Sequence, residues 1–312
     1  MAPLTARPAL RLEFSLLVLA LLGLPLAALA GPAGFAFLEI PAGARASAMG
    51  GATCSLAQGA EAIYLNPAGL AADRGVEVVA SHYEYFESLR HDQFAAGGIL
   101  GGIGLAASVR ALYSEPIPER DELGNLIGSF GSYDLELALG AGGRPSPGLD
   151  LGGTAKLVRE RIANSSAMTY AFDVGAGIAP DVLHGVRIGA TAQNLGPAAH
   201  YDLGTVQGEP VPLPAALQAG LSYPFDVGGM TLSGALEARF TRGRSGVGLA
   251  GAELAFPQAG AAVRMGLRLN DSASSFSAGA GWAYRTLHFD YAFVPYLQDL
   301  GDTHRFSLSA RF

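Results

Sequence analysis

Apolar and polar side chains alternate along the last residues of the chain. The two sets of alternate positions are Phe306, Leu308, Ala310 and Phe312 on one side and Arg305, Ser307, Ser309 and Arg311 on the other. A period of two is the period of a β-strand, so the pattern predicts a strand with one apolar and one polar face. We expect the apolar face to contact lipid, and we interpret Phe306, Leu308 and Phe312 as a C-terminal insertion signal for the outer membrane.

The same pattern recurs through most of the chain. From about residue 76 onward, about fourteen segments alternate or have strand-like composition, and turn residues separate them. The sequence therefore predicts an all-β fold, a transmembrane antiparallel β-barrel of about fourteen strands. Twelve or sixteen strands are alternatives, because residues 245–256 change phase and residues 76–85 are irregular. A soluble β-sandwich is disfavoured by the number of segments.

Charged side chains of both signs fall on the polar faces of these segments. We expect a lumen lined by Lys156, Arg187, Glu237, Arg239, Arg264, Arg268, His288 and Asp290. Opposite charges on facing walls can form ion pairs, and water can satisfy the remaining groups.

The lengths of the connections predict how the barrel is oriented. The two longest, at residues 114–128 and 194–212, follow the third and seventh segments, whereas tight turns follow several even-numbered segments. Bacterial barrels place long loops outside the cell and short turns in the periplasm. Both ends of the barrel are therefore expected on the periplasmic side.

Residues 1–30 have the features of a secretory signal peptide. Arg7 and Arg11 precede an apolar run that Gly-Leu-Pro interrupts and that ends in Ala-Leu-Ala, an A-x-A cleavage pattern. The alternative, an N-terminal membrane anchor, would need about 20 apolar residues in a row. We expect cleavage before Gly31 and localisation in an outer membrane of the Gram-negative type.

Composition narrows the class of protein. The chain has 43 Gly, 15% charged residues, a mean hydropathy of +0.29 and a formal net charge of −7. This is apolar for a secreted globular domain, yet no helix-length apolar run follows the signal, as expected of a barrel that is apolar only outside. The acidic balance argues against nucleic acid as a partner. Cys54 is the only cysteine, which excludes an intrachain disulfide, and we interpret it as a small packed residue.

Residues 35–73 do not alternate and are dense in Gly and Ala. Small residues allow close backbone packing, so we expect a plug, or hatch, folded into the lower barrel. The predicted organisation is a signal peptide at residues 1–30, a hatch at residues 31–74 and a barrel at residues 75–312.

Three stretches carry a family resemblance. FLEIPAGARASAMGGA, then AIYLNPAGLA, and the final DYAFVPYLQDLGDTHRFSLSARF resemble the PorV/PorQ family of outer-membrane proteins, which is itself similar to FadL-type channels. The resemblance implies a FadL-like barrel of fourteen strands with an N-terminal hatch. The motif residues of that hatch would be Gly43, Ala44, Arg45, Gly50, Gly51, Asn66, Pro67, Ala68 and Gly69.

No motif indicates catalysis or metal binding. The Gly-rich stretch at residues 43–51 lacks a preceding strand and the Gly-Lys-Ser/Thr of a phosphate loop. No G-x-S-x-G occurs, and the six histidines are scattered without paired spacing. We therefore predict a protein that is not an enzyme, with no catalytic residue, no cofactor and no metal.

The PorV/PorQ resemblance implies a component of type IX secretion, which would bind secreted substrates and pass them to the surface attachment machinery. External loops would then contact these protein partners. The candidate residues are Glu119, Arg120, Asp121, Glu122, His200, Tyr201 and Asp202.

The alternative is a FadL-like channel for uptake or export of hydrophobic small molecules, in which the hatch gates the lumen. Phe35, Phe37, Leu38 and Ile40 could then line a site for an apolar ligand, although packing against the wall is the more ordinary role. A third interpretation is a structural barrel of unknown partner. Outer-membrane lipid is an expected partner in every case.

Overall fold

The structure, a computed structural model, describes residues 31–72, 75–85, 88–180, 183–204, 206–297 and 301–312. The predicted signal peptide, residues 1–30, lies outside this range and stays a prediction. In the part of the chain that is described, no helix is long and apolar enough to cross a membrane.

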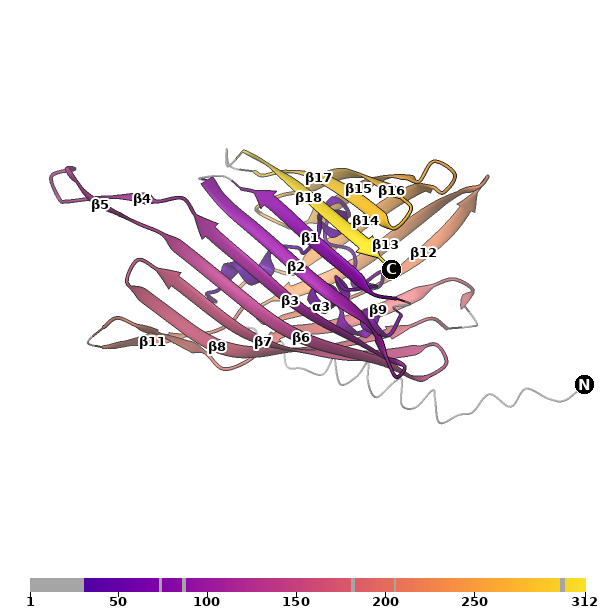
Figure 1. Cartoon of the computed structure of the whole chain (residues 1–312), viewed down its shortest axis with the longest axis horizontal. Coiled ribbons are helices and arrows are strands. Elements are labelled where there is room, and N and C mark those ends of the chain that lie inside the picture. Colours follow the sequence, from indigo (N-terminus) through magenta and orange to yellow (C-terminus); the bar gives the residue numbers. More distant parts are fainter. Residues whose placement is uncertain (1–30, 73–74, 86–87, 181–182, 205, 298–300) are drawn as a thin grey trace, which may run out of the picture.

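Fourteen antiparallel strands form a closed barrel (Figure 1). Closure is made by β1 against β18 and by β8 against β9. The strands of the ring are β1 Glu77–Glu84, β2 Leu89–Leu100, β3 Ile103–Ser114, β6 Ser132–Ser146, β7 Leu149–Ile162, β8 Ser165–Ile178, β9 Arg187–Leu195, β12 Ala216–Val227, β13 Met230–Thr241, β14 Val247–Phe256, β15 Ala261–Leu269, β16 Phe276–Tyr284, β17 Leu287–Pro295 and β18 Asp302–Arg311. The predicted fold class is confirmed, and the alternatives of twelve and sixteen strands are wrong.

Four further strands lie in the two longest connections. β4 Ile117–Arg120 and β5 Leu126–Phe130 form a separate hairpin between β3 and β6. β10 Ala199–Asp202 and β11 Gln207–Val211 lie between β9 and β12 and continue the sheet beyond β8. Both hairpins lie at the end of the barrel opposite the C-terminus (Figure 1). We call this end the loop end and the other the terminal end.

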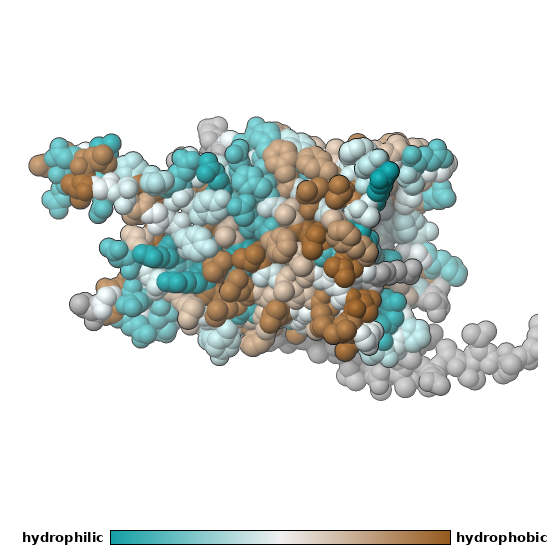
Figure 2. All heavy atoms as spheres, viewed as in Figure 1, coloured by the Kyte–Doolittle hydropathy of each residue, from teal (hydrophilic) through white to brown (hydrophobic). Residues whose placement is uncertain are grey.

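Side chains alternate between the two faces of the wall, as the sequence predicts. On β7, Lys156 is 5% exposed, whereas its neighbour Leu157 is 46% exposed. Apolar residues gather over the middle of the wall, and hydrophilic ones lie toward the loop end (Figure 2). The outward apolar side chains include Leu137, Met168, Tyr170, Leu236, Val263, Met265, Leu267, Trp282, Phe289, Phe306, Leu308 and Phe312. This belt suits the hydrocarbon region of a bilayer.

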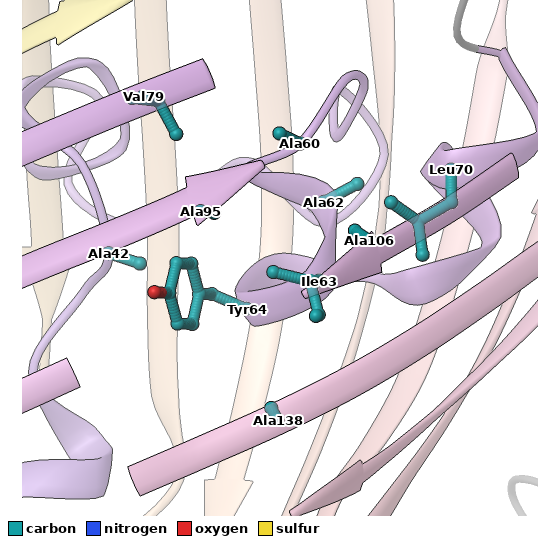
Figure 3. Packing of buried hydrophobic residues seen from close by; sticks show 10 residues of the cluster. All are labelled: Ala42, Ala60, Ala62, Ile63, Tyr64, Leu70, Val79, Ala95, Ala106 and Ala138. Atoms are coloured by element: carbon teal, nitrogen blue, oxygen red, sulfur yellow. The ribbon is translucent and has the colours of Figure 1, made fainter. Parts of the chain in front are cut away.

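Residues 31–72, which we call the inner segment, contain four short helices. These are η2 Ala36–Glu39, α2 Ala44–Ala48, α3 Ala62–Leu65 and η3 Pro67–Ala72. Their side chains pack against inward-facing residues of the wall in several clusters, of which one joins Ile63, Tyr64 and Leu70 to small residues of β2, β3 and β6 (Figure 3). The inner segment therefore fills part of the barrel interior.

Replacing Leu308 by Arg tests the assignment of faces. Leu308 is 51% exposed on the outer surface, and an arginine facing lipid costs about 2–4 kcal/mol at the bilayer midplane and less toward its edges. We expect Leu308→Arg to reduce the yield of folded barrel, measured by heat-modifiable migration on a gel. Ser309→Arg, one position along on the inward face, is the control and should fold nearly as well as the wild type. Equal losses in both variants would contradict the assignment.

Candidate functional site

Glycines on the inner face of the wall let the backbone of the inner segment approach closely. Gly142 of β6 and Gly152 of β7 are paired across the ladder, and a Cβ on either would overlap the Pro67 carbonyl. Gly266 of β15 lies in the same way against Gly50. Since no side chain separates the two backbones, the wall and the inner segment are in direct contact at these points.

Inward-facing carboxylates of the wall accept hydrogen bonds from backbone amides of the inner segment. Glu237 of β13 accepts from the N–H groups of Cys54 and Ser55, both at 3.0 Å. Glu77 of β1 accepts from the Ala60 N–H at 2.8 Å. These bonds satisfy amides of a segment that has little regular helix of its own.

Arg45 joins the inner segment to the wall by a two-point ion pair. Its Nε and Nη2 donate to Glu253 of β14 at 2.8 and 2.9 Å. Arg264 of β15 also donates to Glu253, at 2.5 Å, and to Asp290 of β17 at 2.6 Å. The four charges form one chain near the terminal end of the barrel.

The other predicted hatch residues also contact the wall or shape the turns between helices. The Gly43 N–H donates to Gln93 at 3.1 Å, and the Ala44 N–H donates to Ser307 at 2.7 Å. Gly43, Gly50 and Gly51 have positive φ values of 78°, 68° and 85°, which glycine adopts without strain.

Asn66 organises the turn that begins η3. Its Nδ2 donates to the carbonyls of Cys54 and Ala176 at 3.0 and 3.1 Å. Its Oδ1 accepts from the Ala68 N–H at 3.1 Å, and its own carbonyl accepts from the Gly69 N–H at 2.9 Å. The side chain thus links two parts of the inner segment to β8.

The structure brings Lys156 into a buried cluster on the inner face. Its Nζ lies 2.6 Å from Asp173 and 3.6 Å from Glu136, and Glu136 also pairs with Arg110 at 2.6 Å. Asn194 accepts from the same Nζ at 3.0 Å. Sequence reasoning missed Arg110, Glu136 and Asp173, although each occupies an alternate position of its strand that shares the polar face.

The remaining predicted lumen residues are less closely packed. His288 on β17 is half-buried, and Arg187, the first residue of β9, is exposed. Arg239 and Arg268 line a cavity that is described below.

The predicted partner residues are divided between the two hairpins at the loop end. Glu119, Arg120 and Glu122 are exposed on the β4–β5 hairpin, where Asp121 accepts from three groups of its own turn. His200 and Asp202 are exposed on β10. Tyr201 between them is half-buried and donates to Glu160 at 2.5 Å, which leaves it less available to a partner.

A cavity of about 660 Å³ lies between the inner segment and the loop end. Gly50, Thr53, Cys54 and Tyr64 contribute to it from the inner segment, and the connections around residues 243–245, 270–273 and 296 contribute from the loop end. Leu38 and Ile40 line the cavity, whereas Phe35 and Phe37 are buried in a cluster with wall residues and do not. Of the four candidates for an apolar site, two therefore face the cavity.

Cys54 is buried, so the reactivity of its thiol can report whether the inner segment is in place. It is 3% exposed, its thiol lies 3.8 Å from the Gln218 carbonyl, and burial raises the pKa of the thiol well above its usual value. A thiol in this environment reacts slowly with alkylating reagents. Among the described residues, no group of three or more His, Cys, Asp or Glu is placed to hold a metal ion.

Comparison with known proteins gives a match for the fold but none for the sequence. No protein-family model and no curated protein match the chain. Two solved structures are similar over 86% of this chain: the CymD monoaromatic hydrocarbon channel, at 14% identity, 97% coverage of its chain and a TM-score of 0.60, and the Pseudomonas putida toluene transporter TodX, at 12% identity, 96% coverage and a TM-score of 0.59. A Pseudomonas aeruginosa FadL homologue matches at 12% identity, with 86% and 98% of the two chains covered and a TM-score of 0.49. The fold is a FadL-like barrel, and the PorV/PorQ assignment is not confirmed by any family match.

Removing the Glu237 carboxylate should loosen the inner segment. Because hydrogen bonds to charged groups are worth about 1.5–3 kcal/mol, we expect Glu237→Ala to speed maleimide labelling of Cys54 by roughly tenfold or more. Glu209→Ala, which removes an exposed carboxylate of β11, is the control. Unchanged labelling in folded Glu237→Ala protein would show that this carboxylate does not hold the segment.

Proposed function

We propose that the protein is an outer-membrane channel for small molecules and that the inner segment closes its lumen. The observation that carries this proposal is the cavity, which is bounded at the loop end by connections and at the terminal end by the inner segment. The fold shared with a monoaromatic hydrocarbon channel and a toluene transporter supports the same interpretation. This shared fold favours the channel over type IX secretion, which no comparison supports.

The inner segment is held to the wall partly by polar contacts and partly by buried apolar side chains such as Phe37, Met49 and Leu70. Its backbone meets glycines of the wall, and its amides are held by Glu77 and Glu237. Polar contacts of this kind can be exchanged for water at a small net cost, whereas the buried apolar side chains favour a movement of part of the segment over its complete release. The predicted hatch at residues 31–74 is in this proposal the moving part.

The ion pair between Arg45 and Glu253 joins the inner segment to a strand of the wall by two hydrogen bonds. The Arg45 side chain is 35% exposed and that of Glu253 is 12% exposed, so the pair is only partly desolvated. Arg264 would still balance Glu253 if Arg45 moved away. Glu253 would therefore keep one cationic partner in a state in which Arg45 has moved away.

Breaking this pair should raise the flux through the barrel. We expect Arg45→Gln to increase single-channel conductance or solute-driven swelling of proteoliposomes relative to the wild type. The control is Arg144→Gln, because Arg144 of β6 makes the same two-point contact with Asp150 of β7, at 2.6 and 2.9 Å, in an exposed position at the terminal end. If Arg45→Gln is folded and as impermeable as the control, the inner segment is not a gate held by this pair.

A second candidate function is binding of a protein partner at the loop end, as the secretion hypothesis requires. The β4–β5 hairpin projects from the barrel (Figure 1), and Leu123, Leu126 and Ile127 are 87%, 65% and 61% exposed on it. Apolar side chains on a projecting loop are a common feature of protein contacts.

Native mass spectrometry of the protein extracted from its own outer membrane tests this candidate. We expect a co-purifying secreted polypeptide to be lost from a Leu123→Ser/Ile127→Ser variant and retained in Glu122→Ser, which changes the same turn without removing an apolar side chain. The absence of any polypeptide from the wild type would exclude the secretion function for this hairpin.

A further inference from the structure

Arginines dominate the charged lining of the cavity. Four of them face it, against two carboxylates: Arg110, Arg239, Arg244 and Arg268, against Glu39 and Asp271. Amide side chains of Gln193 and Gln218 line it as well. The cavity is therefore polar and positive in sign, which is unexpected for the passage of a plain hydrocarbon.

Two of these arginines are already neutralised by close ion pairs. Arg110 donates to Glu136 at 2.6 Å, and Arg244 lies 2.7 Å from Glu39. Their charge is balanced within the protein, so these two guanidiniums are less able to attract an anionic ligand.

Arg239 and Arg268 are not balanced in this way. The guanidinium of Arg239 donates to two neutral groups, the Gln218 Oε1 at 3.2 Å and the Thr241 Oγ1 at 3.3 Å. Within the described residues, no carboxylate comes within 4.0 Å of its guanidinium. Two strands away on the same wall, Arg268 forms one longer ion pair among the described residues, with Asp271 at 3.5 Å.

The Arg268 guanidinium also has an unused donor. Its Nε donates to the Gly50 carbonyl at 3.0 Å, but its Nη2 is buried and lacks a hydrogen-bond partner within the described part of the chain. The side chain is only 10% exposed. A buried cationic donor without a partner is costly, and a bound anion would remove that cost.

A third arginine adds to the positive charge behind the lining. Arg305 of β18 is fully buried, and its Nη2 donates to the hydroxyls of Tyr85 and Tyr296 at 2.9 and 3.0 Å. Tyr296 itself lines the cavity. Phenols can accept from a guanidinium without neutralising it.

We propose that the cavity binds a small organic anion, whose carboxylate is held by Arg239 and Arg268. A guanidinium matches a carboxylate in shape and can donate two parallel hydrogen bonds. Leu38, Ile40 and Leu249 line the same cavity and provide apolar surface for a compact body such as an aromatic ring. This inference rests on the proposed channel function and names its substrate class.

Binding of benzoate to the purified full chain in detergent or nanodiscs tests the proposal. Benzyl alcohol, similar in size but neutral, is the comparison ligand, and titration calorimetry at low salt is the measurement. We expect benzoate to bind the wild type. We expect Arg239→Gln to weaken benzoate binding by roughly tenfold to a hundredfold, the range for one charge-assisted hydrogen bond. Arg144→Gln, at the other end of the barrel, should bind as the wild type does.

Arg268→Gln is a second variant with the same expectation, and heat-modifiable migration verifies that each variant is folded. Equal benzoate binding by the wild type and Arg239→Gln would overturn the proposal, as would benzyl alcohol binding at least as tightly as benzoate. Displacement of benzoate by chloride at equal concentration would also overturn it, because the site would then take any anion.

Proteoliposome flux separates this inference from the channel proposal. Entry of benzyl alcohol but not benzoate into vesicles with Arg45→Gln, faster than into protein-free vesicles, would support the channel and contradict the anion proposal. Entry of both solutes no faster than into protein-free vesicles would contradict the channel itself.

Discussion

Closure of the sheet is the constraint on which the rest of the structure depends. Lipid offers no hydrogen-bond partners, so each backbone N–H and C=O of a membrane-spanning strand must be paired within the protein. β1 and β18 meet this need in an unbroken antiparallel register from Glu77 opposite Arg311 to Glu84 opposite His304. Once the ring is closed, the inward side chains surround a fixed interior whose polar groups need partners of their own.

The inner segment supplies many of these partners and takes its own from the wall. A mostly irregular chain has unpaired amides, and Glu77 and Glu237 accept from several of them. Gln193 donates in the other direction, to the carbonyls of Tyr64 and Leu65 at 2.8 and 3.1 Å. Glycines such as Gly142 let the two backbones approach closely enough for these hydrogen bonds, since any Cβ there would push the backbones apart. Neither the wall nor the inner segment has its polar groups satisfied alone.

The alternating pattern predicted the strands well on β15 and β18, where the inward residues that meet the inner segment are glycine or polar. It became irregular where the wall packs an apolar side chain against the inner segment. Leu249 of β14 is an inward apolar residue packed against Met49, which explains the change of phase seen in the sequence. Tyr83 of β1 is likewise buried inward, whereas His82 faces outward and pairs with Asp92 at 2.6 Å. The individual pairings could not be predicted, because residues such as Ser55 and Glu237 are 182 positions apart and no spacing rule connects them.

Two arginines without a close ion pair lie at one end of the barrel interior, and their position bears on how an anion would move. Toward the terminal end, Glu253 and Asp290 are balanced by Arg45 and Arg264, and Glu77 pairs with Arg311. Arg239 and Arg268 lie toward the loop end, on the cavity side. An anion entering from the loop end would therefore meet unpaired positive charge first, and beyond it a terminal end whose charges are balanced. If the inner segment moved as proposed, Glu253 would lose one of its two cations, and the more negative terminal end would then oppose further passage of the anion. The arrangement thus favours capture in the cavity as a step distinct from release.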